Sequence, residues 1–298
     1  MSHRLYRAAA VRSVMCGTFV LAVPAVVAQG QQPRTPSPQI REASRLDLDG
    51  QTMKARVILR QVLDTISDPA AKADAQRAMA MSFAFAGDCA NTTKYESLVI
   101  DYWRSRERAD PGNAYYQEGE MADEAARVCL DANDMDTAER WYRKGYELGL
   151  LEPAPQTHRR ALWDFRLAHA LGRIAARRGD TAQAHREIEA ARHALDADTA
   201  MAAQQERFFP YLVGYVALYT NDLPTAQAQF TKAIALKGNE KDPYLRCLLA
   251  MTDEQLNRHD DAMAQYRDAY DLATAHNPGS AFARRYARVK LDLPDTTD

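Results

Sequence analysis

Residues 165–198 contain the feature that most constrains the fold, a helical hairpin whose design recurs along the chain. This 34-residue segment combines a Leu-Gly pair on its first helix, a Gly-Asp turn, and apolar residues at helical spacing on its second helix: Leu171, Gly172, Gly179, Asp180, Ala184, Ile188 and Ala191. Two helices of this length cannot bury their apolar faces alone. The hairpin must therefore stack on similar neighbours, and several copies are needed for a continuous core.

Other segments of the chain reproduce this design to different degrees. Residues 119–152, 207–240 and 243–276 repeat its small residues, its turn and its apolar trio, whereas residues 73–106 are a looser copy. Residues 36–69 are interpreted as a degenerate terminal repeat, because a terminal repeat needs one polar outer face. The turns between paired helices are predicted at Gly87-Asp88, Asn133-Asp134, Gly179-Asp180, Asn221-Asp222 and Asn257.

These positions resemble the pattern of the tetratricopeptide repeat family, in which a Leu-Gly pair precedes small and large apolar positions on a second helix. The resemblance covers residues 39–291 and implies an all-α, right-handed superhelical solenoid of stacked helix-turn-helix repeats. No strand-like alternation of useful length occurs in the sequence, which also favours an all-α fold. The repeat pattern is shared by functionally unrelated proteins, so it is informative about fold and weakly informative about function.

The C-terminal end of the repeats is predicted to be covered by one further helix. Residues 277–279 form a turn signal, Asn-Pro-Gly, after the last repeat. We expect a capping helix over residues 280–291, with Ser280 as its N-cap, because a serine hydroxyl accepts the free backbone N–H groups of a first turn. Residues 292–298 are expected to be a polar tail.

The N-terminal segment predicts export. Residues 1–28 have a basic start without acidic residues, an apolar stretch, and a Val-Val-Ala end that fits a cleavage site, as in a secretory signal peptide. An uncleaved anchor is the alternative interpretation. Residues 29–38 are rich in Pro and Gln and are expected to be a flexible linker. The mature protein is therefore expected in the periplasm or outside the cell, without stable membrane insertion.

The charge of the chain argues against a nucleic-acid partner. The formal net charge is −2. Removal of the three arginines of the predicted signal peptide lowers it to about −5. An acidic, exported protein lacks the basic surface that phosphate backbones require.

Two cysteines are candidates for a disulfide. Cys89 follows the turn of one predicted repeat, and Cys129 lies in the first helix of the next, so that stacking could bring them together. The alternative is that Cys129 is a small core residue and Cys89 a reduced surface residue. An oxidising compartment favours the bridge. Cys247 is then the unpaired thiol.

No motif in the sequence indicates catalysis, a cofactor or a metal. The nearest approach to a metal site is His185, Glu189 and His193, which lie four residues apart on one helix face. An ordinary solvated face is the preferred interpretation, because three collinear residues do not converge tetrahedrally on zinc. We therefore expect a protein that is not an enzyme and has no cofactor.

Aromatic and basic residues on two first helices are the candidate binding site. Phe208, Tyr211, Tyr215 and Tyr219 follow spacings of three or four and share one helix ridge. The alternative is that Phe208 and Phe209 belong to the core. The family resemblance implies that first helices line a concave groove that binds extended peptides. By that resemblance, four residues of the preceding repeat flank the ridge: Arg166, His169, Arg173 and Arg177.

The sequence thus predicts a non-enzymatic scaffold that binds a protein or peptide partner of the cell envelope through this groove. Tyrosine and arginine suit such a surface, because they supply contact area and charge-assisted hydrogen bonds. The alternative is a binding protein for an anionic small molecule, glycan or lipid head group held by Arg166, Arg173 and Arg177. A hydrolase built on the repeats is a third hypothesis, and no identified residue supports it.

Overall fold

The computed structural model describes residues 35–294, and these residues contain helices and no strands. The all-α prediction is confirmed for this part of the chain. The predicted signal peptide, the linker up to residue 34 and residues 295–298 of the predicted tail lie outside the described residues. None of the helices among residues 35–294 is both long and apolar enough to cross a membrane.

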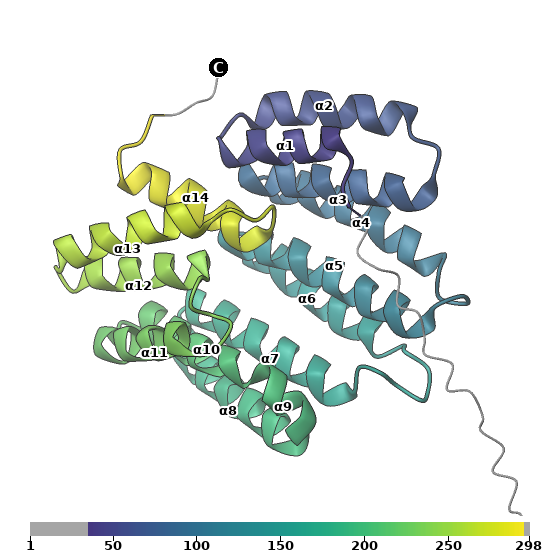
Figure 1. Ribbon diagram of the computed structural model, residues 1–298. Helices are drawn as coiled ribbons and strands as arrows, with labels where there is room; N and C mark the ends of the chain where they lie inside the picture. Colours follow the sequence, from purple (N-terminus) through teal and green to yellow (C-terminus); the bar gives the residue numbers. More distant parts are fainter. Residues whose placement is uncertain (1–34, 295–298) are drawn as a thin grey trace, which may run out of the picture. The chain divides into compact units, whose positions relative to one another are not determined.

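Most helices pair into hairpins that follow one another along the chain (Figure 1). The hairpins are α1 (Pro38–Leu48) with α2 (Thr52–Thr65), α3 (Pro69–Phe85) with α4 (Cys89–Arg104), α5 (Pro111–Asp131) with α6 (Met135–Gly149), α7 (Arg160–Arg177) with α8 (Thr181–Ala197), α10 (Phe209–Tyr219) with α11 (Leu223–Ala235), and α12 (Pro243–Gln255) with α13 (His259–Leu272). Each hairpin also contacts the hairpin that follows it in sequence.

One turn type joins the helices of the repeated hairpins. Gly87 and Gly179 have φ of 71° and 76°, and Asn133 and Asn221 occupy the same left-handed region at the equivalent positions. Glycine and asparagine tolerate this conformation, which ends a helix in a Schellman-type motif. The following aspartate accepts a hydrogen bond from the backbone N–H three residues on, as Asp180 Oδ1 does from Gln183 N at 2.9 Å. These turns are where the sequence predicts them.

Small residues on the second helices allow close packing within the hairpins. The predicted alanine positions are all buried, whereas the predicted inward residue Ile188 is only half-buried. The alanines are Ala138, Ala184, Ala191, Ala226, Ala233, Ala262 and Ala269. Larger side chains fill the position between two alanines, such as Phe230 on α11 and Tyr266 on α13. Because alanine side chains are small, two helix backbones can approach closely at these positions.

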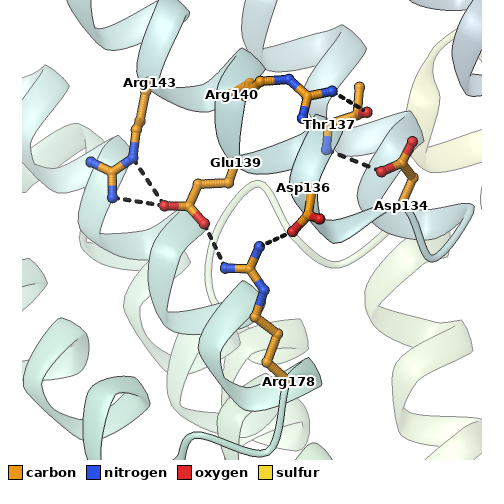
Figure 2. A network of polar contacts seen from close by, with 7 residues as sticks. All are labelled: Asp134, Asp136, Thr137, Glu139, Arg140, Arg143 and Arg178. Carbon is orange, nitrogen blue, oxygen red and sulfur yellow. Dashed lines mark hydrogen bonds and ion pairs between the residues drawn. The ribbon is translucent and has the colours of Figure 1, made fainter.

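An exposed network of charges connects α6 to the end of α7 (Figure 2). Arg178 donates hydrogen bonds to Asp136 Oδ1 at 2.6 Å and to Glu139. Glu139 also accepts a hydrogen bond from the guanidinium of Arg143 at 2.8 Å. Solvent screens such pairs, so each contributes a few tenths of a kcal/mol up to about 1 kcal/mol. The network helps to orient neighbouring hairpins and adds little to stability.

A disulfide joins the second and third hairpins. Cys89 at the start of α4 is bonded to Cys129 on α5, with Cα atoms 4.7 Å apart and a sequence separation of 40. Cys247 on α12 is buried and free. The bridge adds a covalent link between α4 and α5, which also meet through packing and through the Arg104–Glu118 ion pair at 3.8 Å.

The structure differs from the predicted elements in two places: it contains a helix that was not predicted, and the C-terminal helix begins earlier. Residues 199–206, for which the sequence indicated no element, form the short helix α9 (Thr199–Gln205) and the start of a 3-10 turn, η1 (Glu206–Phe208), because Asp198 caps a new first turn. The predicted capping helix is α14 (Pro278–Lys290), and its N-cap is Asn277 instead of Ser280. Proline is favoured at the first helical position, so the helix begins earlier than predicted.

The C-terminal helix α14 contacts α3 and α5 as well as its neighbours α12 and α13. His276 Nε2 lies 2.8 Å from a carboxylate oxygen of Asp47, and Arg284 donates to the Leu48 carbonyl at 3.0 Å. The His276 ring also stacks on Phe85 with ring centroids 5.3 Å apart. Residues far apart in sequence are therefore in direct contact, and this places residues 271–280 beside the first helices of earlier hairpins.

Candidate functional site

The candidate site is a cavity of about 780 Å³ among the first helices of successive hairpins. Its wall comes from α5, α6, α7, the end of α9, η1 and α10, from the segment before α12, and from the connection between α13 and α14. Figure 1 shows α5, α7 and α10, the first helices of three hairpins. The volume falls in the range typical of small-molecule sites, about 300–1,000 Å³.

One arginine of the cavity is neutralised by carboxylates. Arg166 on α7 lies 2.7 Å from Glu120 and 3.8 Å from Asp123, both on α5. It also donates to the Tyr116 hydroxyl at 3.1 Å and lies over the ring of Trp163. Because its charge is paired, Arg166 contributes little net positive charge to the cavity.

A second arginine, Arg173, is held by oxygen atoms that carry no formal charge. Its guanidinium donates to the hydroxyls of Tyr142 and Tyr211, each at 2.9 Å, and to the His169 carbonyl at 3.2 Å. Its side chain is only 5% exposed. Within residues 35–294 Arg173 makes no direct ion pair with a carboxylate, so its positive charge at the cavity wall is balanced only in part, by the more distant Asp123 and Asp131.

Arg127 on α5 is a third arginine of the wall and is not among the residues predicted from the sequence. It lies over the ring of Tyr244 at 4.2 Å, and its Nε has no hydrogen-bond partner among the described residues. A usable signal was present: Arg127 is the ninth residue of the repeat 119–152, and Arg173 is the ninth of 165–198. Equivalent positions on successive first helices reach the same cavity.

His169 is a neutral member of this group. Burial, followed by the nearby Arg173 charge, lowers its pKa well below the ordinary histidine value. The ring packs against Tyr211 with centroids 4.8 Å apart, and its Nε2 has no hydrogen-bond partner in the described part of the chain. His169 therefore offers a polar nitrogen without adding positive charge at neutral pH.

No protein-family model matches this sequence, and no curated protein matches it at a significant level.

The cavity brings together five of the eight predicted binding residues: Arg166, His169, Arg173, Phe208 and Tyr211. Phe208 and Phe209 also pack against the core of the fourth and fifth hairpins, as the alternative interpretation expected. Tyr211 is 7% exposed, so only an edge of its side chain reaches the cavity. The predicted open aromatic ridge is thus largely covered.

The other three predicted residues, Arg177, Tyr215 and Tyr219, do not line the cavity. Tyr215 is 0% exposed, which excludes direct contact with a partner in this conformation. The prediction for Tyr215 is corrected because α12 packs beside α10 and shares a core with it. Arg177 donates to the Tyr215 and Tyr219 hydroxyls at 3.1 and 3.4 Å, so these three residues form a separate polar cluster.

The histidine-rich face of α8 lies away from the cavity. His185, Glu189 and His193 are all exposed, as the solvated-face interpretation expected. Within residues 35–294 no group of three or more potential ligands could hold a metal ion.

Asp123 in the cavity wall gives a testable pH dependence. Burial raises its pKa to about 7, although the nearby Arg166 charge lowers it. The folded protein therefore binds this proton more tightly than the unfolded chain, whose aspartate titrates near about 4. Stability linked to this proton is full below about pH 4 and is lost as the pH rises toward about 7.

The variant Asp123→Asn removes this titration. Relative to the wild type, its free energy of unfolding should rise by about 2–3 kcal/mol between about pH 5 and about pH 8. Urea unfolding at each pH measures the difference, and Asp136→Asn at an exposed position of α6 serves as the control. Parallel stability curves for the wild type and Asp123→Asn would show that Asp123 is not desolvated.

Proposed function

We propose that this protein is a non-enzymatic, exported binding protein whose ligand is part of an envelope protein or peptide that enters the cavity. The observation that carries the proposal is the cavity itself, which is built from equivalent side chains on the first helices of successive hairpins. Tyrosine and arginine dominate energetically important contacts in protein interfaces, and both types line this cavity.

We further propose that the hairpins form a right-handed superhelical solenoid of the tetratricopeptide kind. The proposal is supported by the repeated turns, the small residues of the second helices and the contacts between successive hairpins. In such an arrangement one face of each first helix remains available for a partner.

The partner is proposed to be compact, such as a chain end or a short segment. Residues 274–280, which come from the C-terminal part of the chain, line the same cavity as α5 and α7. The first helices therefore do not present one continuous surface to an extended peptide. A cavity of about 780 Å³ accommodates a few residues of a partner.

Export to the periplasm or the cell exterior remains part of the proposal. It is supported by the signal-like residues 1–28 and by the disulfide between Cys89 and Cys129, because disulfides persist mainly in oxidising compartments. The location can be tested by fractionation of cells that express the full chain.

Photo-crosslinking from inside the cavity tests the proposed function. A photoreactive amino acid replaces Gln205, which lines the cavity, or Glu189, which is exposed on α8. After irradiation in intact envelopes, we expect one dominant crosslinked partner from position 205 and no such product from position 189. The partner is then identified by mass spectrometry.

A cavity-filling variant provides the matched control. Ala275 and Ala203 are both exposed, but only Ala275 lines the cavity. Ala275→Trp should reduce the crosslink from position 205 by about tenfold or more. The bulky ring occupies the cavity, and the loss of about 1.4 kcal/mol of binding free energy weakens binding tenfold. Ala203→Trp should leave it unchanged. Equal crosslinking from positions 205 and 189 would contradict the proposal.

A further inference from the structure

Arg173 and His169 contact Tyr211 at the wall of the cavity, and Arg127 lines the same wall. Arg173 donates to the Tyr211 hydroxyl, and the His169 ring contacts the Tyr211 ring. Arg127 Nε and His169 Nε2 are buried and have no hydrogen-bond partner among residues 35–294. Buried polar nitrogens without partners are rare in native proteins and require an explanation.

Asp131 and Asp242, whose charges favour the charged form of Arg127, have other hydrogen-bond partners. Asp131 accepts a hydrogen bond from the Tyr244 hydroxyl at 2.8 Å. Asp242 caps α12 by accepting from the backbone N–H groups of Tyr244 and Leu245 at 2.8 and 3.2 Å. Both act on Arg127 at a distance, but neither forms an ion pair with it in the described residues. The arginine charge is thus only partly balanced.

Two arginines of α7, Arg166 and Arg173, differ in whether a carboxylate pairs with them. Arg166, two turns earlier on the same helix, is paired with Glu120 and Asp123. Arg173 has only tyrosine hydroxyls and a backbone carbonyl as hydrogen-bond acceptors. Arginine remains charged in proteins, so burial without a directly paired carboxylate leaves a positive group that a bound anion would stabilise.

The first turn of α14 adds a second source of positive potential. Pro278, Gly279 and Ser280 line the cavity, and a Cβ atom on Gly279 would lie 3.6 Å from Arg127 Nη2. A helix N-terminus carries the positive end of the helix dipole, which repels a guanidinium and attracts an anion. Arg127 and this helix end line the same cavity, and both would favour an anion placed beside them.

We infer that the cavity contains an oxyanion subsite formed by Arg127, Arg173 and the N-terminus of α14. The ligand group is a carboxylate or a phosphate, which accepts charge-assisted hydrogen bonds from guanidinium groups. Tyr211 and Phe208 supply an aromatic wall beside it. The inference deepens the proposed function and rests on it only in taking the cavity as the binding site. The sequence suggested that Arg166 and Arg177 hold an anionic ligand together with Arg173. The inferred subsite uses Arg127 instead of these two residues.

Small aromatic probes test the subsite without any protein partner. Phenyl phosphate, phenylacetate and the uncharged benzyl alcohol are titrated into the full chain by calorimetry. We expect at least one anion to bind about tenfold or more tightly than the alcohol, because a charge-assisted hydrogen bond contributes about 1.5–3 kcal/mol, equivalent to at least tenfold in affinity. Binding should weaken at raised salt concentration.

Two arginine variants form a matched pair. Arg127→Gln should weaken anion binding by about tenfold or more, whereas Arg177→Gln should leave it unchanged, since Arg177 does not line the cavity. Arg127→Lys, which keeps the charge, should recover part of the affinity. Thermal melts confirm that all three variants are folded, and Arg173 is left intact because it is buried.

The probes also separate the chemical sources of the anion. Preferential binding of phenyl phosphate assigns a phosphorylated ligand, and binding of phenylacetate as tightly or more tightly assigns a carboxylate. Equal affinity for benzyl alcohol, equal effects of Arg127→Gln and Arg177→Gln, or no anion binding tighter than about 1 mM would overturn the inference. If position 205 crosslinks a partner but the anions do not bind, the oxyanion subsite is wrong and the proposed function still holds. If position 205 gives no crosslink, the result counts against the proposed function.

Discussion

Replacement of both Cys89 and Cys129 by alanine should lower the free energy of unfolding by about 4 kcal/mol. The disulfide closes a loop with a sequence separation of 40 residues, and its removal restores conformational entropy to the unfolded chain. Domains are typically stable by only about 5–15 kcal/mol, so this is a large fraction of the total. Chemical denaturation of the oxidised wild type and the double variant measures the difference.

The free thiol provides the control for this experiment. Cys247→Ala leaves the bridge intact, so a reducing agent should destabilise this variant as much as it destabilises the wild type. The same agent should have no effect on the double variant of Cys89 and Cys129. If the oxidised wild type and the double variant had equal stability, the bridge would not contribute as expected.

Trp163→Ala should destabilise the protein by about 3–5 kcal/mol. Trp163 is 1% exposed and fills the space left by two glycines of the preceding hairpin. A Cβ atom would lie 2.4 Å from the Trp163 ring if placed on Gly119 and 2.1 Å from it if placed on Gly149. Loss of the ring would leave a cavity that backbone atoms cannot easily fill.

A second tryptophan gives a comparison for this change. Trp141 on α6 is only half-buried, and Trp141→Ala should therefore cost clearly less than Trp163→Ala in urea unfolding. The reciprocal change Gly149→Ala should also destabilise the protein, because the added methyl group meets the Trp163 ring. Equal effects of Trp163→Ala and Trp141→Ala would show that the glycine contact is not a major packing site.

The hairpins were predictable because their signals are local. Each turn needs a residue that tolerates positive φ, and the chain places Gly or Asn there, as at Gly179 and Asn221. Alanines at helical spacing likewise predicted the inward faces of the second helices. Helix α9 was missed because its seven residues carry no clear periodic pattern, and only the cap at Asp198 marks its start.

The site was predicted only in part because it depends on contacts between distant residues. The helical ridge of Tyr211 and Tyr215 was a correct reading of spacing, but spacing does not show that α12 covers Tyr215. The contacts of α14 with α3 and α5, which bring residues 277–280 to the cavity, have no signal in any short window of sequence. Arg127 could have been found by comparing equivalent repeat positions.

The position dependence of photo-crosslinking tests most directly whether the cavity binds a partner. We expect that a photoreactive residue at Gln205 captures one partner and that Ala275→Trp abolishes most of this capture. The same residue at Glu189 should capture nothing comparable. If Gln205 and Glu189 gave the same products, or if Ala275→Trp and Ala203→Trp had equal effects, the cavity would not be the binding site.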